Sequence, residues 1–353
     1  MEKRNNALAM HVIHKIKYTI KVTIAYAMYY SGILWIIKHW KLNNNAVVLM
    51  YHRVLPAEVR EESFSYSGII VSPETFETHI QFLEKHFNIV NCNQFTDHIT
   101  ENKPFKNNTC LITFDDGWAD NYHHAYPILA KYQTPATIFI PVDYISSNNL
   151  FWQESMGHTI YQLLRSSHSA ATQAIASLGL TELSSLPEAQ QKERIMDFVR
   201  VQKKRSYDEI DTLQHKLNKA LEGQSISQQS DRYLNWPQIN EMANNGVTFD
   251  SHACSHKILT RLSQHEISEE LSRAKHVIEE KTYRKVLTIA YPNGDCDNTV
   301  ESIANACEYK VGFTTRCGTA NHNSSAFTIN RVNIKDATTR NRPMFLATLL
   351  GIF

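Results

Sequence analysis

The stretch Leu111–Trp118, which reads LITFDDGW, decides the fold that we expect for this chain. Apolar residues run directly into two adjacent carboxylates, Asp115 and Asp116, and Gly117 then lets the backbone turn away. This pattern predicts a buried strand that carries charge at its carboxyl end. Neighbouring carboxylates repel each other unless a cation or a shared proton lies between them. The pair therefore destabilises the fold, and its presence favours a role in catalysis or metal binding. A strand end followed by an ordinary Asp-Gly turn is the alternative interpretation.

Strand-like and helix-like segments alternate on both sides of this stretch. The expected strands are 46–51, 87–90, 110–116, 136–140, 247–251, 286–291, 311–314 and 327–332, and the expected helices are 73–86, 121–133, 236–245, 266–282 and 300–306. Alternation of this kind predicts an α/β fold, a parallel sheet with helices outside it. An α/β barrel uses roughly 250 residues as one domain. The 353 residues of this chain therefore leave room for an N-terminal appendage and an insertion.

Three segments fall outside the alternation. In residues 1–45, basic residues precede the apolar run 22–37. No signal-peptide cleavage site follows this run. The run is also shorter than the ~20 residues that comfortably span a bilayer. We expect a helix that contacts a membrane interface, the alternative being a helix packed across the bottom of the main domain. Residues 146–232 predict a mostly helical insertion, a lid or a groove wall, with a flexible exit at Gln224–Gln229. Residues 336–353 predict a C-terminal apolar helix that closes the barrel or touches a membrane.

The composition allows a full hydrophobic core and limits the binding partners that we expect. The chain is 42% hydrophobic and 20% charged, and its net charge of +1 gives no reason to expect nucleic acid. Its 6 cysteines form no C-x-x-C pair, so a zinc ribbon is unsupported, and we expect reduced thiols. The expected location is the cytoplasm or the cytoplasmic face of the inner membrane.

Polar residues of the kinds that bind metals or substrates follow the ends of the predicted strands. They are His52, Asp115, Asp116, His252, Pro292 to Gly294, and Arg331. In a parallel barrel the carboxyl ends of all strands open onto one face, and active sites lie on that face. We therefore expect these residues to gather at one end of the barrel.

His252 and His256 are separated by three residues in the segment HACSH and would share a face on a helical turn. Two imidazoles and one carboxylate form a common divalent-metal set with open positions for water and substrate. Cys254 lies between the two histidines, would point off their face, and is expected to pack in the core. Such a set accepts Zn²⁺, Co²⁺, Ni²⁺ or Fe²⁺, and we expect Zn²⁺ as the commonest.

Taken in order, these motifs resemble those of a known enzyme family. Thr113–Gly117 and Ser251–His256 look like the first two signature motifs of the polysaccharide deacetylase family, the NodB-homology carbohydrate esterases of family 4, and Ala290–Gly294 resembles the third. Tyr233–Trp236 also resembles that family, and Val48–Val54 resembles the opening strand of its exopolysaccharide and poly-N-acetylglucosamine deacetylase branch. The resemblance covers roughly residues 46–335. It implies a distorted (β/α) barrel of about seven parallel strands and the metal-dependent removal of acetyl groups from an N-acetylated saccharide, either a polysaccharide or a lipid-linked sugar.

The resemblance also implies roles for single residues. Asp116, His252 and His256 would hold the metal, and Asp115 would be the general base. The metal polarises the acetamide oxygen and lowers the pKa of its bound water. His52 would protonate the leaving amine.

On the substrate side, the turn formed by Tyr291, Pro292 and Asn293 would offer a backbone N–H to the oxyanion. Many family members carry an arginine two residues before the motif-three proline, and that arginine contacts the base; this chain has Ala290 at the position. Arg331 is the cation that would replace it, and we group Arg331 with the substrate and oxyanion residues.

Two further departures from the family pattern bear on the site. The late Leu-x-His motif is missing, which is why the acid role falls to His52, and Ala253 stands where Ser or Thr is frequent. Neither departure removes a metal ligand or the base. The competing hypothesis is a catalytically silent sugar-binding or polysaccharide-assembly protein that keeps the barrel. The four intact residues Asp115, Asp116, His252 and His256 argue against it.

Overall fold

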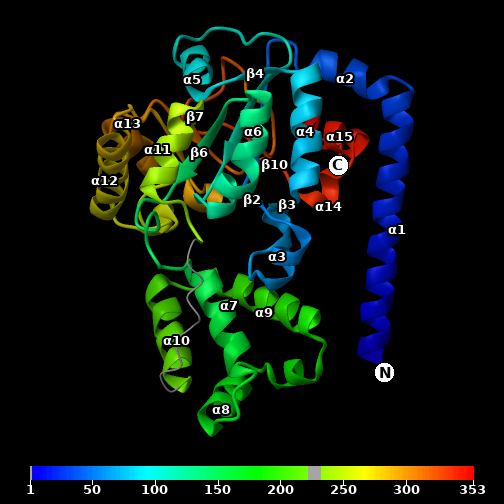
Figure 1. Ribbon diagram of the computed structural model, residues 1–353, viewed down its shortest axis with the longest axis vertical. Coiled ribbons are helices and arrows are strands. Elements are labelled where there is room, and N and C mark those ends of the chain that lie inside the picture. Colours follow the sequence, from blue (N-terminus) through cyan, green and yellow to red (C-terminus); the bar gives the residue numbers. More distant parts are fainter. Residues whose placement is uncertain (1, 222–231) are drawn as a thin grey trace.

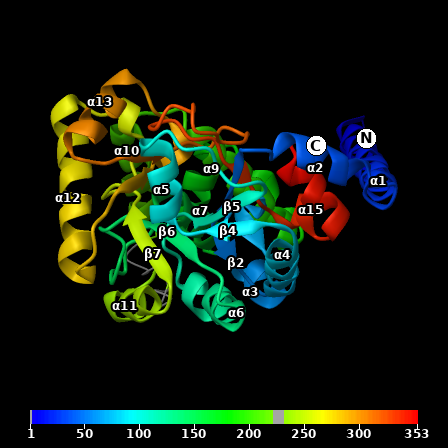
Figure 2. The same ribbon diagram turned by 90° about the horizontal axis from the view of Figure 1, so that it is seen from above.

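The computed structural model describes residues 2–221 and 232–353, so the expected flexible exit Gln224–Gln229 lies outside the described residues. Parallel strands form a curled sheet with helices around it (Figures 1 and 2). Seven strands follow one another across the sheet in the order β10-β1-β5-β6-β7-β8-β9, and β4 pairs with the first half of β5. Their bounds are β1 (Ala46–Tyr51), β4 (Asn88–Val90), β5 (Thr109–Phe114), β6 (Ala136–Ile140), β7 (Val247–Ser251), β8 (Thr288–Ala290), β9 (Val311–Phe313) and β10 (Val332–Asn333). The expected α/β fold, a distorted barrel of about seven parallel strands, is confirmed.

The last strand is shorter than expected, because only the end of 327–332 belongs to it. Ile329 makes an isolated parallel bridge with Phe313, and the Arg331 N–H donates to the carbonyl of Arg316 (2.9 Å). Pairing with β1 begins at Val332. The segment therefore crosses from the β9 side of the sheet to the β1 side, which divides its hydrogen bonds between the two edges.

Helices cover the outside of the sheet. They are α4 (Pro73–His86), α5 (Cys92–Thr100), α6 (Tyr126–Tyr132), α11 (Trp236–Asn244), α12 (Gln264–Thr282) and α13 (Asn298–Ala306). At α4 the Ser72 side chain accepts from the Thr75 N–H and Pro73 holds the first position, which is the start that the sequence predicts. The expected helix 121–133 begins as a π-helical turn, Asn121–Ala125, before α6. The six residues of β5 are all buried, as expected for a strand covered on both faces.

The insertion is helical, with its own apolar core. It contains α7 (Trp152–Leu163), α8 (Ser169–Ser177), the short helix η3 (Thr181–Ser185), α9 (Glu188–Gln202) and α10 (Tyr207–Ala220). Met156, Ile160, Ile195 and Val199 are buried together, and Phe64 from the barrel joins them. In Figure 1 these helices lie below the sheet, and the short elements β2 (Arg53–Val54), α3 (Ala57–Glu62), η1 (Ser67–Ile69) and β3 (Ile70–Val71) lie between sheet and insertion.

The N- and C-terminal segments pack together on one side of the molecule. α1 (Glu2–Tyr30) lies beside α15 (Arg342–Leu349), which follows α14 (Asp336–Thr339), and α2 (Ile33–Lys41) crosses the end of α4 (Figure 1). Seven of the eight residues of α15 are buried. Among the described residues no single helix is long and apolar enough to cross a bilayer. The part of α1 from Lys15 and α2 meet that test only together, and they are bent by 82°.

Candidate active site

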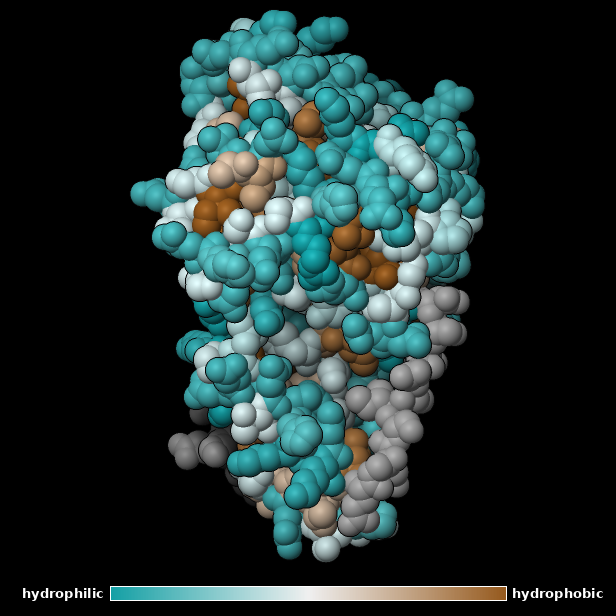
Figure 3. Space-filling model, turned by 90° about the vertical axis from the view of Figure 1, so that its left-hand side faces the viewer, coloured by the Kyte–Doolittle hydropathy of each residue, from teal (hydrophilic) through white to brown (hydrophobic). Residues whose placement is uncertain are grey.

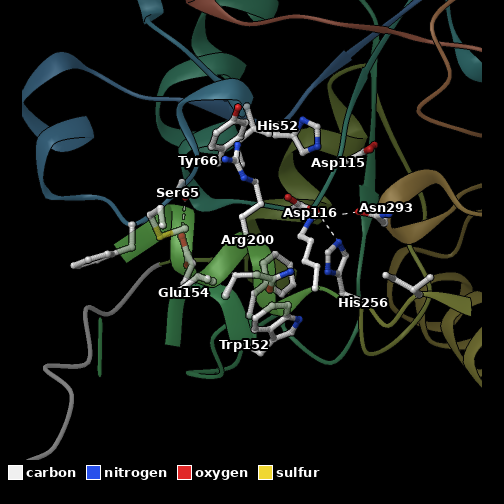
Figure 4. A pocket seen from close by; sticks show the side chains of 18 of the residues that line it. His52, Ser65, Tyr66, Asp115, Asp116, Trp152, Glu154, Arg200, His256 and Asn293 are labelled. Carbon is white, nitrogen blue, oxygen red and sulfur yellow. Dashed lines mark hydrogen bonds and ion pairs between the residues drawn. The ribbon is translucent and has the colours of Figure 1, made fainter. Parts of the chain in front are cut away.

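Two adjacent carboxylates leave the end of β5 in different directions. The Asp115 N–H donates to the carbonyl of Tyr51 (3.0 Å) and so continues the ladder with β1. Asp116 has a φ of 78° and Gly117 a φ of 64°, so the chain already turns at Asp116. Both side chains are buried, and Figure 4 shows them at the same end of the sheet as His52, His256 and Asn293.

The two predicted imidazoles converge on Asp116. The Nε2 atoms of His252 and His256 lie 3.4 and 3.2 Å from the same carboxylate oxygen, Oδ1. One ligand atom of each residue lies within 4.8 Å of the other two. The second oxygen of Asp116, Oδ2, accepts from the indole N–H of Trp118 (3.0 Å). Two segments, the end of β5 and the loop after β7, thus place one oxygen and two nitrogens around a common point.

The loop that carries the histidines is not the helical turn that we expected. Ala253 and His256 adopt positive φ angles of 61° and 56°, so the two imidazoles meet through an irregular loop after β7. Glu270 of α12 holds this loop: its Oε2 accepts from the N–H groups of Cys254 (2.8 Å) and Ser255 (2.9 Å). Its Oε1 accepts from the Ser255 hydroxyl (2.5 Å). Cys254 is buried and its thiol donates to the Glu270 carbonyl (3.1 Å), so it packs as expected.

The donor set fits a divalent metal ion. The His252 Nδ1–H donates a hydrogen bond to the carbonyl oxygen of Ala290 (2.6 Å), which leaves Nε2 with a free lone pair. Such a carbonyl–imidazole contact is typical behind metal-bound histidines. Burial raises the pKa of Asp116, but the neighbouring imidazoles of His252 and His256 outweigh this effect, so the pKa lies well below the usual value. Asp116 is therefore an anion, as a ligand must be.

Asp115 is held by Arg331 from behind. Arg331 Nη1 and Nη2 each lie 2.7 Å from one oxygen of the Asp115 carboxylate, and Arg331 Nε donates to the carbonyl of Thr314 (2.9 Å). Burial raises the pKa of Asp115, but the charges of Arg331 and His252 outweigh it, so the net shift is downward. Arg331 is fully buried and is not among the residues that line the cavity. It therefore contacts the expected base, as the cation that compensates for Ala290 should, but it does not line the cavity with the substrate-facing residues among which we group it.

His52 lines the same cavity from the end of β1. Its Nδ1 is buried and has no hydrogen-bond partner among the described residues. Burial lowers the pKa of His52 more than the charges of Asp116 and Asp115 raise it, so the net shift is downward. A buried imidazole nitrogen without a partner is unfavourable unless something else uses it.

Of the third motif, only Asn293 lines the cavity. It lies in the short helix η5 (Pro292–Gly294), with a φ of 61°. The Tyr291 N–H donates to the carbonyl of Phe313 (3.1 Å), and Pro292 has no N–H. Within this turn the Asn293 N–H is therefore the one without an acceptor among the described residues, and Tyr291 and Pro292 act as its support.

The cavity extends from this group to the insertion. Its volume is about 380 Å³, which is the size of a small-ligand site. Sequence reasoning missed the residues that form its far wall: Phe64, Ser65, Tyr66, Phe151, Trp152, Glu154, Met196, Arg200, Lys203 and Tyr207. The pair Phe151-Trp152 at the start of the insertion was the one available signal, since paired aromatics beside polar helices often mark a binding surface.

Buried charge joins this wall to the barrel. Arg53 Nε donates to Asp120 (2.9 Å), and its Nη1 lies 3.6 Å from Glu154 of α7. Glu154 accepts from the Ser65 hydroxyl (2.7 Å), and burial raises its pKa. The guanidinium of Arg53 also lies 4.1 Å from the ring centre of Trp118. The insertion is thus fixed next to the metal-type cluster.

Comparison with known proteins agrees with this architecture. YxkH of Bacillus subtilis, which carries a provisional assignment as a polysaccharide deacetylase, is 22% identical over 288 residues, 81% of this chain and 70% of that protein. The poly-beta-1,6-N-acetyl-D-glucosamine N-deacetylase of Staphylococcus aureus is 35% identical over 114 residues, which span 30% of this chain and only 39% of that enzyme. The solved structure of the Streptococcus pyogenes deacetylase PplD in complex with acetate shares the fold, with a TM-score of 0.57 at 20% identity, over 86% of this chain and 98% of that one.

The family model described as polysaccharide deacetylase matches residues 102–312, the span that begins just before β5 and ends in β9. This span contains the adjacent carboxylates, both histidines of the loop after β7 and the Asn293 turn. With more than half of its length matched, the chain belongs to the polysaccharide deacetylase family.

Proposed function

We propose that this protein is a metal-dependent hydrolase that removes N-acetyl groups from amino sugars of a polysaccharide or a lipid-linked saccharide. The observation that carries the proposal is the convergence of Asp116, His252 and His256 beside a second carboxylate, Asp115, in one cavity. Family membership and the N-deacetylase named among the relatives support the reaction type.

In the proposed reaction Asp116, His252 and His256 would hold the ion, for which Zn²⁺ is our first choice. When bound, a divalent ion at this position polarises the acetamide carbonyl and makes a water more acidic. Asp115 takes a proton from the attacking water, because Arg331 keeps its carboxylate ionised and fixes its plane. The bidentate contact leaves the remaining lone pairs of the carboxylate for that proton.

The other groups act on the oxyanion and the leaving nitrogen. The Asn293 N–H is free to donate to the oxygen that becomes negative as water attacks. His52 would donate a proton to the sugar nitrogen as the C–N bond breaks, so that acetate and a free amine leave. Its role as the acid is a proposal that depends on its place on the cavity wall.

The test is acetate release from N-acetylglucosamine oligomers, combined with metal analysis of the same samples. We expect Asp115→Asn to retain metal and lose activity, by at least about a hundredfold, and His252→Ala to lose both. Asp97→Asn, an exposed carboxylate on α5, is the matched control and should change neither. Retained activity in Asp115→Asn would remove Asp115 as the base. An unaltered metal content in His252→Ala would overturn the ligand set.

A further inference from the structure

The insertion gives the cavity a positively charged wall. Arg200 of α9, Lys203 at its end and Arg261 of the short helix η4 (Leu259–Arg261) all line the cavity. Figure 4 shows the side chain of Arg200 reaching toward Tyr66.

The carboxylates of the cavity do not need these cations. Asp115 is paired with a buried arginine, and Asp116 lies beside the two imidazoles with which it would share the metal ion. Glu154 lies 3.6 Å from Arg53 and 3.8 Å from Arg232. Asp115 and Glu154 therefore have their counter-charges from behind, and Asp116 would have the metal ion, so none of them needs Lys203 as an ion-pair partner.

Lys203 is the central cation of this wall. Its Nζ donates to the side-chain oxygen of Asn293 (3.3 Å), so the ammonium group lies over the turn that would face the oxyanion. Lys203 makes no ion pair among the described side chains; Asp116 and Asp295, whose charges act on its ammonium group, lie beyond ion-pair distance. Arg200 contacts Asp197 of its own helix (2.9 Å).

Helix capping explains only part of this arrangement. A cation near a helix C-terminus is stabilising by itself. Arg261 acts in this way, because its Nη1 donates to the carbonyls of Lys203 (2.8 Å) and Arg205 (3.2 Å) just after α9. Lys203 does not, since its ammonium group points across the cavity to Asn293.

We propose that Lys203, flanked by Arg200 and Arg261, is a subsite for an anionic group of the saccharide, a phosphate or a carboxylate carried by the acetylated sugar or its neighbour. The proposal rests on the proposed function and narrows its substrate class to negatively charged saccharides. A flexible ammonium group suits either anion as a point charge, and the arginines add directed donors.

The test compares three probes for binding to the zinc-loaded 353-residue chain: neutral di-N-acetylchitobiose, N-acetylglucosamine 1-phosphate, and a disaccharide of N-acetylglucosamine with glucuronic acid. Binding is measured by calorimetry and turnover by acetate release. We expect at least one charged probe to bind about tenfold more tightly than the neutral one at low salt, and the preference to shrink as salt is raised. The phosphate and carboxylate probes show which anion is preferred.

Variants of Lys203 separate charge from structure. Lys203→Gln keeps a donor for Asn293 and should weaken the charged probe about tenfold while leaving the neutral probe almost unchanged, and Lys203→Arg should restore the preference. Lys204→Gln, the next and exposed residue, is the control. Equal affinity for all probes, or an equal loss for charged and neutral probes in Lys203→Gln, would overturn the subsite. Because calorimetry needs no turnover, a failure of the proposed deacetylase activity would be seen separately.

A second observation, on α1 and α2, carries a different proposal. Most of the large apolar side chains that are exposed among the described residues lie on these two helices: Ile16, Tyr18, Ile20, Ile24, Tyr26, Tyr30, Ile33, Ile36 and Trp40. The face that bears α12 is mostly hydrophilic by contrast, as Figure 3 shows. Clustered apolar exposure of this kind marks an interaction surface.

The charge of the same segment indicates the partner. Lys15, Lys17 and Lys21 are exposed between these apolar side chains. The sequence contains no Asp or Glu between Glu2 and Glu58. Basic residues interleaved with isoleucine and aromatic side chains suit the headgroup region of an anionic bilayer, where lysine can extend to the phosphates.

We propose that α1 and α2 dock on the surface of a bilayer that contains anionic lipid. The 82° bend between the two helices suits contact along the surface. The test is co-sedimentation of the full chain with vesicles of phosphatidylcholine, with and without phosphatidylglycerol. We expect binding to the anionic vesicles only, and a loss of about tenfold or more in the triple variant Ile16→Ser, Ile20→Ser, Ile24→Ser.

The control for this experiment is Tyr283→Ser, because Tyr283 is 93% exposed and lies elsewhere in the chain. Absence of vesicle binding by the unaltered protein, or undiminished binding by the triple variant, would overturn the proposal. A dimer in light scattering that dissociates in the triple variant, without any vesicle binding, would identify a second copy of the chain as the occupant and would equally overturn it.

Discussion

Asp115 and Arg331 are 216 residues apart in the sequence and meet in a two-point contact, with both N···O distances at 2.7 Å. Both side chains are buried, with 0% of the Arg331 and 3% of the Asp115 side chain exposed. In this geometry the guanidinium group fixes the orientation of the carboxylate as well as its charge. The expected base is therefore defined by a residue that never touches the cavity.

Replacing Arg331 by Met should impair catalysis and stability together. The remaining carboxylate would be buried without its counter-charge, which costs about 3–5 kcal/mol in typical buried pairs. The pKa of Asp115 would rise, so the acid limb of the pH–rate profile should move to higher pH. Arg331→Lys should recover part of the charge effect but not the two-point contact. The measurements are urea unfolding and kcat/KM against pH, and an unmoved acid limb would contradict the assigned pairing.

Glu270 should control metal affinity without touching the metal. Its carboxylate holds the Cys254 and Ser255 N–H groups of the loop that ends in His256. Loss of such outer contacts typically lowers metal affinity about 10–100-fold. We expect that loss in Glu270→Ala when zinc affinity is measured by chelator competition, with partial recovery in Glu270→Gln. Glu269→Ala, an exposed neighbour, is the control, and equal zinc affinity in Glu270→Ala and that control would refute the positioning role.

Gly117 should tolerate alanine less well than Gly246. Both have positive φ, 64° and 94°, which costs an L residue about 1–2 kcal/mol. A Cβ at Gly117 would also lie 3.0 Å from Ile140 and 3.1 Å from Ile145, whereas a Cβ at Gly246 meets nothing within 4 Å. Urea unfolding of the two alanine variants should therefore show a larger loss of stability for Gly117→Ala. Equal losses would mean that the neighbouring isoleucines move aside without cost.

His79 should make the folded state sensitive to acid. Its Nε2 lies 2.7 Å from the carbonyl of Thr339, its Nδ1 lies 3.1 Å from the hydroxyl of Tyr51, and its ring stacks on Phe345. Burial lowers the pKa of His79 to about 4, below the ordinary value of 6.5. Between pH 4 and pH 6.5 the unfolded chain therefore binds a proton at His79 more readily than the folded chain does. The stability contributed by neutral His79 is lost as the pH falls from 6.5 toward 4.

The unfolding free energy measured at pH 7 and at pH 5 tests this linkage. The contribution of His79 should fall by about 2 kcal/mol between the two. His79→Gln should be less stable at pH 7 but should lose less on going to pH 5. The same pH dependence in both proteins would assign the effect to other groups.

The predictions from sequence agree most closely with the structure for elements that are determined by residues close together in the sequence. Alternation of apolar runs and helical segments predicts the parallel sheet, because a strand buried on both faces must be apolar throughout. The start of α4 at Ser72 and Pro73 is equally local. The last strand is less predictable, since the hydrogen bonds of 327–332 are shared between β9 and β1, and only the curl of the whole sheet determines that division.

The sequence by itself determined that Asp115, Asp116 and His252 follow strand ends, and parallel strands bring their carboxyl ends to one face whatever else the chain does. Only the tertiary structure decided the rest of the site. It turns Arg331 toward Asp115, brings His256 back through residues with positive φ, and sets Lys203 over Asn293. The reason is physical: the end of a strand depends on neighbours in sequence, whereas the direction of a side chain and the docking of an insertion depend on the packing of segments far apart in the chain.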